Sequence, residues 1–133
     1  MSQTFANYRA PGVSKPEYIY IIAEKTIKLG TGGYTGYHKV GRTDNLQERV
    51  KELQTANPHK LECSWYMKVD PSQKNTAERA AHAAVSDQYR SDENGGKEWY
   101  RVPFQLQANF VQLVLRGVQA ANVAVLETNI RFF

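Results

Sequence analysis

The stretch from Tyr37 to Arg49 constrains the fold most, because it predicts a short strand that leads through a turn into a helix. The strand should cover Tyr37 to Gly41. Asp44 and Gln47 have the spacing of a capping box, so a helix should begin at Asp44. Its apolar stripe at positions i, i+4 and i+7 consists of Leu46, Val50 and Leu53. This strand-turn-helix unit also carries three cations, which are Lys39, Arg42 and Arg49.

Two further stretches predict β-strands. Residues 18–23 form an aromatic and β-branched run that is apolar on both faces, as expected of a central strand. Its period of two places Tyr18, Tyr20 and Ile22 on one face. The glycine-rich residues 24–36 suit a long hairpin loop. Residues 61–69 alternate between apolar and polar side chains, which predicts one common apolar face made of Leu61, Cys63, Trp65, Met67 and Val69.

Two more helices complete the pattern. One should begin between Ser72 and Asn75 and end near Tyr89, with a face of alanines that allows close packing. Residues 98–102 can form a short edge strand, and Pro103 suits the first turn of a third helix. The predicted class is α+β, with a small antiparallel sheet of about three strands flanked by helices and an additional C-terminal helix. The predicted divisions are a flexible tail (1–16), a catalytic or DNA-binding domain (17–102) and a C-terminal helical extension packed on the same domain (103–133).

Length, charge and cysteine content set broad limits. A chain of 133 residues can build one hydrophobic core without disulfides. Its formal net charge of +4 suits a polyanionic partner, but only mildly. The single cysteine, Cys63, excludes an internal disulfide and a cysteine-rich zinc site. Residues 1–16 lack the apolar run of a signal peptide, and no stretch is long and apolar enough to cross a bilayer. We therefore expect an intracellular protein, cytoplasmic or nucleoid-associated, without a membrane partner.

Arg49, Tyr20 and Lys39 are the first candidates for chemistry. Arg49 lies beside the apolar stripe of its helix, where a charge is costly unless it is paired or faces a cleft. Alternatively, its stem covers apolar surface while its guanidinium reaches water. Tyr20 can equally be one more core aromatic, and Lys39 can be an exposed strand residue. Taken singly, these residues leave both interpretations open.

Glu78 offers a carboxylate, and His82 follows one helical turn later on the same stripe. Asn75 and Glu78 also fit a capping box, in which Glu78 would only close the start of the helix. Glu78 and His82 can be a metal site or an exposed pair, and two residues do not make a zinc signature. A tyrosine, cations and a carboxylate on separate elements nevertheless suit phosphodiester cleavage, which needs an orienting group, positive charge and a metal ligand.

At these residues the chain resembles the GIY-YIG nuclease superfamily. The first motif is similar to residues 18–20, with Tyr18 in place of the usual glycine. The second is similar to residues 39–41, with Lys39 in place of the usual tyrosine. Residues 41–49 match the G-x-T-x-x-L-x-x-R string of the family. The L-Q-T-x-N-P string and the Gly-Lys-Glu-Trp-Tyr segment further downstream resemble a divergent, often phage-encoded branch that is described as DNA-binding.

The resemblance implies a role for each candidate residue. Tyr20 would help to deprotonate the attacking water, either as the base or through its hydrogen bonds. Lys39 would lower the pKa of Tyr20, since a nearby cation favours the phenolate. Arg49 would hold the scissile phosphate. Glu78, which falls where the family has its metal-binding glutamate, would bind one Mg²⁺ or Mn²⁺. Further DNA contacts are expected from Arg42, His38, His82, Tyr37 and Lys97.

Three functions remain open at this point. The leading hypothesis is a metal-dependent endonuclease of GIY-YIG type that hydrolyses double-stranded DNA. The second is a catalytically inactive nucleic-acid-binding module of the same fold, with stacking by Tyr34, Tyr37, Tyr66 and Trp99. The third is a protein-interaction module, or a homo-oligomer, that uses the third helix and the final residues Phe132 and Phe133.

Overall fold

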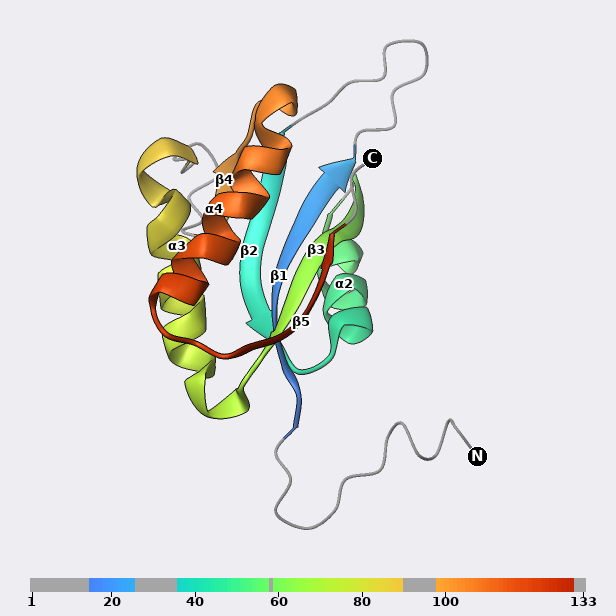
Figure 1. Cartoon of the computed structure of the whole chain (residues 1–133). Coiled ribbons are helices and arrows are strands. Elements are labelled where there is room, and N and C mark those ends of the chain that lie inside the picture. The colour runs from blue at the N-terminus through green and yellow to red at the C-terminus, as the bar shows by residue number, and fades with distance from the viewer. Residues whose placement is uncertain (1–14, 26–35, 58, 90–97, 131–133) are drawn as a thin grey trace.

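The computed structural model describes residues 15–25, 36–57, 59–89 and 98–130 (Figure 1). One antiparallel sheet has the strand order β4-β2-β1-β3-β5, with bounds β1 Glu17–Lys25, β2 Tyr37–Thr43, β3 Lys60–Val69, β4 Trp99–Arg101 and β5 Val125–Ile130. The α-helices of the described residues are α2 Leu46–Thr55, α3 Lys74–Tyr89 and α4 Gln107–Ala120. The predicted antiparallel α+β class is confirmed, although the sheet has five strands rather than about three.

The two additional strands lie at the edges of the sheet. β4 is the short edge strand anticipated within residues 98–102, and it pairs with β2. β5 pairs with β3, so the segment 103–133, which was predicted to be helical, contains a helix followed by a strand. The β5 sequence has no clear alternation, and its conformation comes from hydrogen bonding to the open edge of β3.

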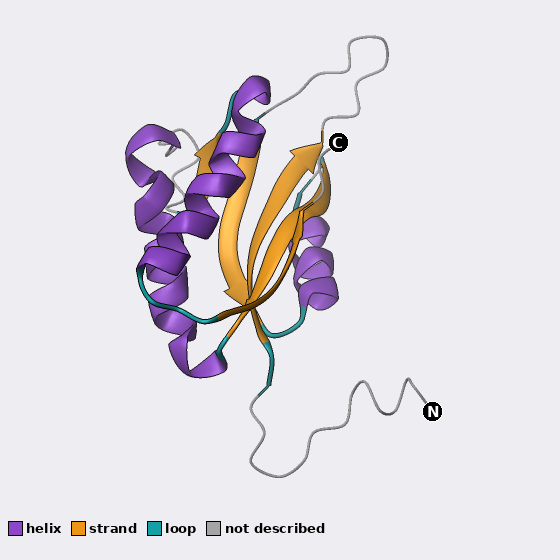
Figure 2. Cartoon of the chain, in the orientation of Figure 1, coloured by secondary structure: helices purple, strands orange, loops and turns teal. Residues whose placement is uncertain are grey.

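Helices cover both faces of the sheet (Figures 1 and 2). α3 and α4 pack together on one face, whereas α2 lies alone on the other. The central strand β1 directs Ile19 and Ile21 into the core under α3 and α4. It directs Tyr20 and Ile22 toward α2. Both faces of β1 are therefore buried, as its continuous apolar run predicted.

A β-bulge at Ser64 contradicts the predicted common face of β3. Ile21 pairs with Trp65, but Ile22 pairs with Cys63, so Ser64 is an extra residue in the ladder. The Ser64 hydroxyl donates a hydrogen bond to the carbonyl oxygen of Ile21 at 3.2 Å. The alternation changes phase there, so the row predicted to share one face divides between the α2 side (Leu61, Cys63) and the α3/α4 side (Trp65, Met67, Val69).

Two helix starts decide how the candidate residues are interpreted. α2 begins at Leu46 rather than at Asp44, because its N-cap is Asn45, which accepts a hydrogen bond from the backbone N–H of Glu48 at 3.0 Å. α3 begins within the predicted window, after a 3₁₀ turn, Pro71–Gln73. Asn75 lies inside α3 and is not its N-cap, so the capping-box interpretation of Glu78 is wrong.

Some predictions concern residues outside the described ranges. These are the tail up to residue 14, the loop at 26–35, Lys97 and the final pair Phe132 and Phe133. Within the described ranges, no helix has the length and apolar character needed to cross a membrane.

Candidate active site

Tyr20 lies on the central strand, directly opposite Gly41 of β2. It is only 1% exposed and packs with Ile22 and Leu61. A Cβ atom at position 41 would lie 2.5 Å from the Tyr20 hydroxyl oxygen, which is closer than real Cβ contacts. Glycine is therefore needed at position 41 so that the phenol can lie across β2.

Tyr20 keeps its proton at neutral pH. Burial raises the pKa of Tyr20 to about 12, with further upward contributions from the charges of Glu98 and Glu78. The positive charge of Arg49 lowers the pKa but does not offset the burial. The prediction that Lys39 favours a phenolate is therefore wrong, because the phenol is buried and its pKa moves upward.

Lys39 is nearly buried and is not an exposed strand residue. Its ammonium donates a hydrogen bond to the carboxylate of Glu98, and its Nζ atom lies 5.8 Å from the centroid of the Trp99 ring. Burial alone would raise the pKa of Glu98, but the hydrogen bond and charge of Lys39 hold that pKa below its ordinary value. Strand pairing creates this contact, since Lys39 lies opposite Trp99 and the Val40 N–H donates to the Glu98 carbonyl oxygen at 3.0 Å.

Arg49 is on α2 with 37% of its side chain exposed. Its Nε atom lies 3.5 Å from a carboxylate oxygen of Glu52, and it is shielded from solvent without a hydrogen bond among the described residues. The guanidinium is close enough to lower the pKa of Tyr20 and also that of Glu98. The positive charge of Arg49 thus acts on these two residues, and part of its side chain is accessible.

Glu78 on α3 forms an ion pair with Arg42 on β2. The Arg42 Nε atom lies 3.2 Å from one Glu78 oxygen, and an Arg42 terminal nitrogen lies 3.7 Å from the buried Glu17. Lys74 lies 4.0 Å from the other oxygen of Glu17. Arg42, which was predicted to contact DNA, is therefore held between two carboxylates.

His82 follows Glu78 on the same face of α3. Its Nε2 atom lies 3.8 Å from the second Glu78 oxygen, and among the described residues this buried nitrogen has no hydrogen-bond partner. The Nδ1 atom is 2.5 Å from the Tyr100 hydroxyl, and the two rings are stacked. Burial lowers the pKa of His82 more than the neighbouring Glu78 and Glu98 raise it, so the ring is neutral at neutral pH.

Two other predicted DNA contacts have different surroundings. His38 is buried beside Phe110 of α4, with its Nδ1 atom 2.9 Å from the Gly36 carbonyl oxygen. This position contradicts a DNA contact by His38, because its ring is in the core. Tyr37 lies near the β4 edge, where the Arg101 guanidinium lies 5.0 Å from the centroid of its ring.

The structure thus gathers six predicted residues with one that was not predicted, Glu98. We call this group the β2 site, and it consists of Tyr20, Lys39, Arg49, Glu78, Arg42, His82 and Glu98. Sequence reasoning missed Glu98 as a member of the site. The signal was the Gly-Lys-Glu-Trp-Tyr segment, but its contact with Lys39 depends on the pairing of β2 with β4.

Residues 17–119 match the T5orf172 domain. The chain belongs to the T5orf172 domain family. The domain is associated with phages, and the match includes every residue of the β2 site and most of α4. Neither the curated proteins nor the solved structures gave a match to the chain.

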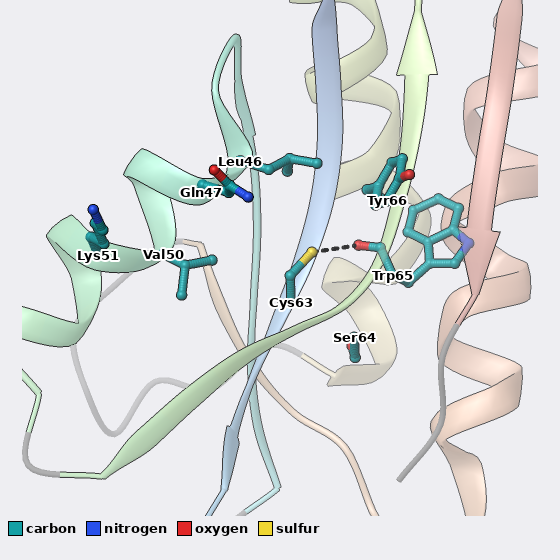
Figure 3. Close-up of a pocket in the computed structure, with 8 residues that line it drawn as sticks. All are labelled: Leu46, Gln47, Val50, Lys51, Cys63, Ser64, Trp65 and Tyr66. Atoms are coloured by element: carbon teal, nitrogen blue, oxygen red, sulfur yellow. Dashed lines mark hydrogen bonds between the residues drawn. The ribbon is translucent and has the colours of Figure 1, made fainter. Parts of the chain in front are cut away.

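The T5orf172 domain also has an open groove of about 660 Å³ between α2 and β3 (Figure 3). Its lining consists of Leu46, Gln47, Val50, Lys51, Cys63, Ser64, Trp65 and Tyr66. The close-up shows the Cys63 thiol directed toward the Trp65 carbonyl oxygen, and the Trp65 ring on the other side of β3. No residue of the β2 site lines this groove, so its volume does not mark the place of the chemistry.

Proposed function

We propose that this T5orf172 domain is a metal-dependent DNA endonuclease of GIY-YIG type, which hydrolyses phosphodiester bonds at the β2 site. The observation that carries the proposal is the convergence of Tyr20, Arg49 and Glu78. They come from β1, α2 and α3, yet the charges of Arg49 and Glu78 both act on the Tyr20 phenol. A buried orienting group, an accessible cation and a carboxylate suit the hydrolysis of a phosphodiester.

Arg49 is the group best suited to bind the scissile phosphate. Its side chain is partly exposed, and its Nε atom, which is shielded from solvent, has no hydrogen bond among the described residues. A guanidinium can donate two parallel hydrogen bonds to phosphate oxygens and can stabilise the charge that develops on them. The ion pair with Glu52 is long and exposed, so it competes only weakly with a phosphate.

Tyr20 acts as a hydrogen-bonding group rather than as a phenolate base. With a pKa of about 12, its hydroxyl is protonated at neutral pH. A protonated phenol can accept a hydrogen bond from the attacking water and donate one to a phosphate oxygen. The contact with Gly41 restricts where the hydroxyl lies, which favours a defined orientation of that water.

The carboxylate of Glu78 suits a divalent ion, Mg²⁺ or Mn²⁺. The unpartnered His82 Nε2 atom lies beside it, which is consistent with a place for a further ligand. When bound, such an ion supplies Lewis-acid stabilisation of the phosphate oxygens. Arg42 keeps the Glu78 side chain oriented through the contact at 3.2 Å.

Cleavage of supercoiled, linear and branched DNA with Mg²⁺ or Mn²⁺ tests the proposal. The wild-type domain should cleave at least one substrate. Arg49→Ala and Glu78→Ala should each reduce the rate by about 100-fold or more, as expected when a group that stabilises the transition state is removed. Arg116→Ala on α4 and Asp87→Ala on α3 are matched controls at exposed positions, and they should cleave at the wild-type rate.

One observation favours an alternative to the endonuclease, namely a DNA-binding module without catalysis. Arg42 already pairs with Glu78, and Lys39 already pairs with Glu98, so both carboxylates have a counter-charge in the absence of any ion. If no substrate is cleaved, and if wild type and Glu78→Ala bind DNA equally with an affinity that falls as salt rises, the endonuclease is excluded and the binding module is supported.

A further inference from the structure

We propose that Glu78, His82 and Glu98 together form one site for a divalent transition-metal ion, with the His82 Nε2 atom as a nitrogen ligand. This inference deepens the proposed function and rests on it, since it names the complete ligand set of the β2 site. Glu78 and His82 lie one turn apart on α3, whereas Glu98 directly precedes β4. The third ligand therefore comes from a different element.

The positions of the three side chains suit a common ion. One ligand atom from each of them can be chosen so that all lie within 4.8 Å of one another. Ligands about 2.1 Å from an octahedral ion are separated by about 3.0 Å when adjacent and by about 4.2 Å when opposite. Both glutamate side chains have exposed surface and can move by the few tenths of an ångström that remain.

His82 has the hydrogen bonding of a metal ligand. Its Nδ1 atom is engaged with the Tyr100 hydroxyl at 2.5 Å, and Tyr100 is fully buried. If Nδ1 carries the proton and donates to that oxygen, Nε2 has a free lone pair next to Glu78. A metal-bound histidine commonly donates its other ring N–H in this way, which sets its tautomer and ring orientation. A buried, unpartnered nitrogen beside the Glu78 carboxylate is costly unless an ion or a water satisfies it.

Two cations compete with an ion for these ligands. Lys39 donates to the Glu98 carboxylate, and Arg42 contacts Glu78. An incoming ion must displace the Lys39 contact or share the carboxylate with it, and it is repelled by the ammonium charge. Lys39→Met should therefore increase the affinity for the ion several-fold, whereas the loss of a ligand should lower it.

The nitrogen ligand determines which ion is preferred. Mg²⁺ is held by oxygen ligands and water, whereas imidazole suits divalent transition metals. We therefore expect Mn²⁺ to bind more tightly than Mg²⁺. Each ion should bind the wild type more tightly than it binds Glu78→Gln or Glu98→Gln. Each substitution should lower the affinity for the ion at least tenfold.

Electron paramagnetic resonance of the full chain with Mn²⁺ alone tests the site without DNA or activity. Spin-echo envelope modulation should show a directly bonded nitrogen in the wild type. This signal should be absent in His82→Gln and present in His59→Gln, a matched control outside the cluster. Tyr100→Phe keeps the packing but removes the hydroxyl, and it should weaken Mn²⁺ binding by about 10-fold to 100-fold.

The proposal is overturned if the wild type shows no nitrogen modulation, if the modulation persists in His82→Gln, or if Glu98→Gln binds Mn²⁺ as the wild type does. Weaker Mn²⁺ binding by Lys39→Met also counts against Glu98 as a ligand. Failure of this site and failure of the proposed function are distinguishable. Cleavage without the nitrogen signal retains the endonuclease but rejects this ligand set. The nitrogen signal without cleavage retains this ligand set but rejects the endonuclease.

Discussion

The two faces of the sheet differ in how completely they are covered. On one face, α3 and α4 each contribute four buried residues to a continuous core. On the other, α2 contributes no fully buried residue, and a groove stays open between α2 and β3. The well-packed face should provide most of the stability, whereas the thinly covered face leaves Arg49 accessible. The β2 site combines Tyr20 and Arg49 from the thin side with Glu78 and His82 from the packed side.

The largest expected effect tests the packed face. Phe110 of α4 is fully buried and contacts His38, Tyr89 and Tyr100. Phe110→Ala should lower the free energy of unfolding by about 3–5 kcal/mol, because it removes apolar contacts and leaves a cavity. Urea denaturation measures this loss. Phe110→Leu is the milder control. If Phe110→Ala lowers the free energy of unfolding by no more than a surface substitution does, the contrast between the two faces is refuted.

A second variant tests the junction between the faces. Gly41→Ala should lower the free energy of unfolding by about 1–3 kcal/mol, since its Cβ would meet the Tyr20 ring. If the proposed function is right, cleavage should fall as well, because the hydroxyl must move. A double-mutant cycle with Tyr20→Phe measures the coupling between the two positions. Independent, additive effects would show that the close approach is not what requires glycine.

A third variant tests the thin face directly. Leu53 is half-buried on α2 and packs against the small cluster around Tyr20. Leu53→Ala should cost about 1 kcal/mol, below the range typical of fully buried leucines. The same urea series used for Phe110 compares the two faces. A cost equal to that of Phe110→Ala would mean that α2 is as important for stability as α4.

The smallest effect concerns pH and the packed face. Burial lowers the pKa of His38 in the folded state, although its hydrogen bond to Gly36 acts in the opposite direction. As the pH falls, His38 therefore takes up a proton in the unfolded state before it does so in the folded state. The contribution of neutral, buried His38 to the free energy of unfolding is complete above the pKa of His38 in the unfolded state and declines below that pKa. The urea midpoint should decrease between about pH 7.5 and about pH 5.5. His38→Gln should reduce that decrease, and an unchanged pH dependence would exclude His38 as a cause.

Local patterns predicted most of the elements. The apolar run of β1, the helix after β2 and the start of α3 each depend on neighbours within a few residues, so the chain encodes them directly. The family string from Gly41 to Arg49 pointed to the segment that contributes two cations, Arg42 and Arg49, to the site. The charged partners of those cations were less predictable, because ion pairs between elements have no sequence spacing.

Three features show where the local patterns failed. Alternation along β3 could not reveal the bulge at Ser64, which reverses the direction of the residues before it. Burial moved the Tyr20 pKa upward, opposite to the effect expected from a neighbouring cation. Val125–Ile130 became β5 because an edge of the sheet was available for pairing.

By itself, the sequence determined the α+β class, the central strand and the residues of the β2 site other than Glu98, since these follow from periodicity and from short motifs. Only the tertiary structure decided that Lys39 pairs with Glu98, that Arg42 lies between Glu17 and Glu78, and that Glu78, His82 and Glu98 come together in one cluster. The physical reason is that these contacts depend on strand order and helix placement. Both are set by the burial of apolar surface across the whole chain.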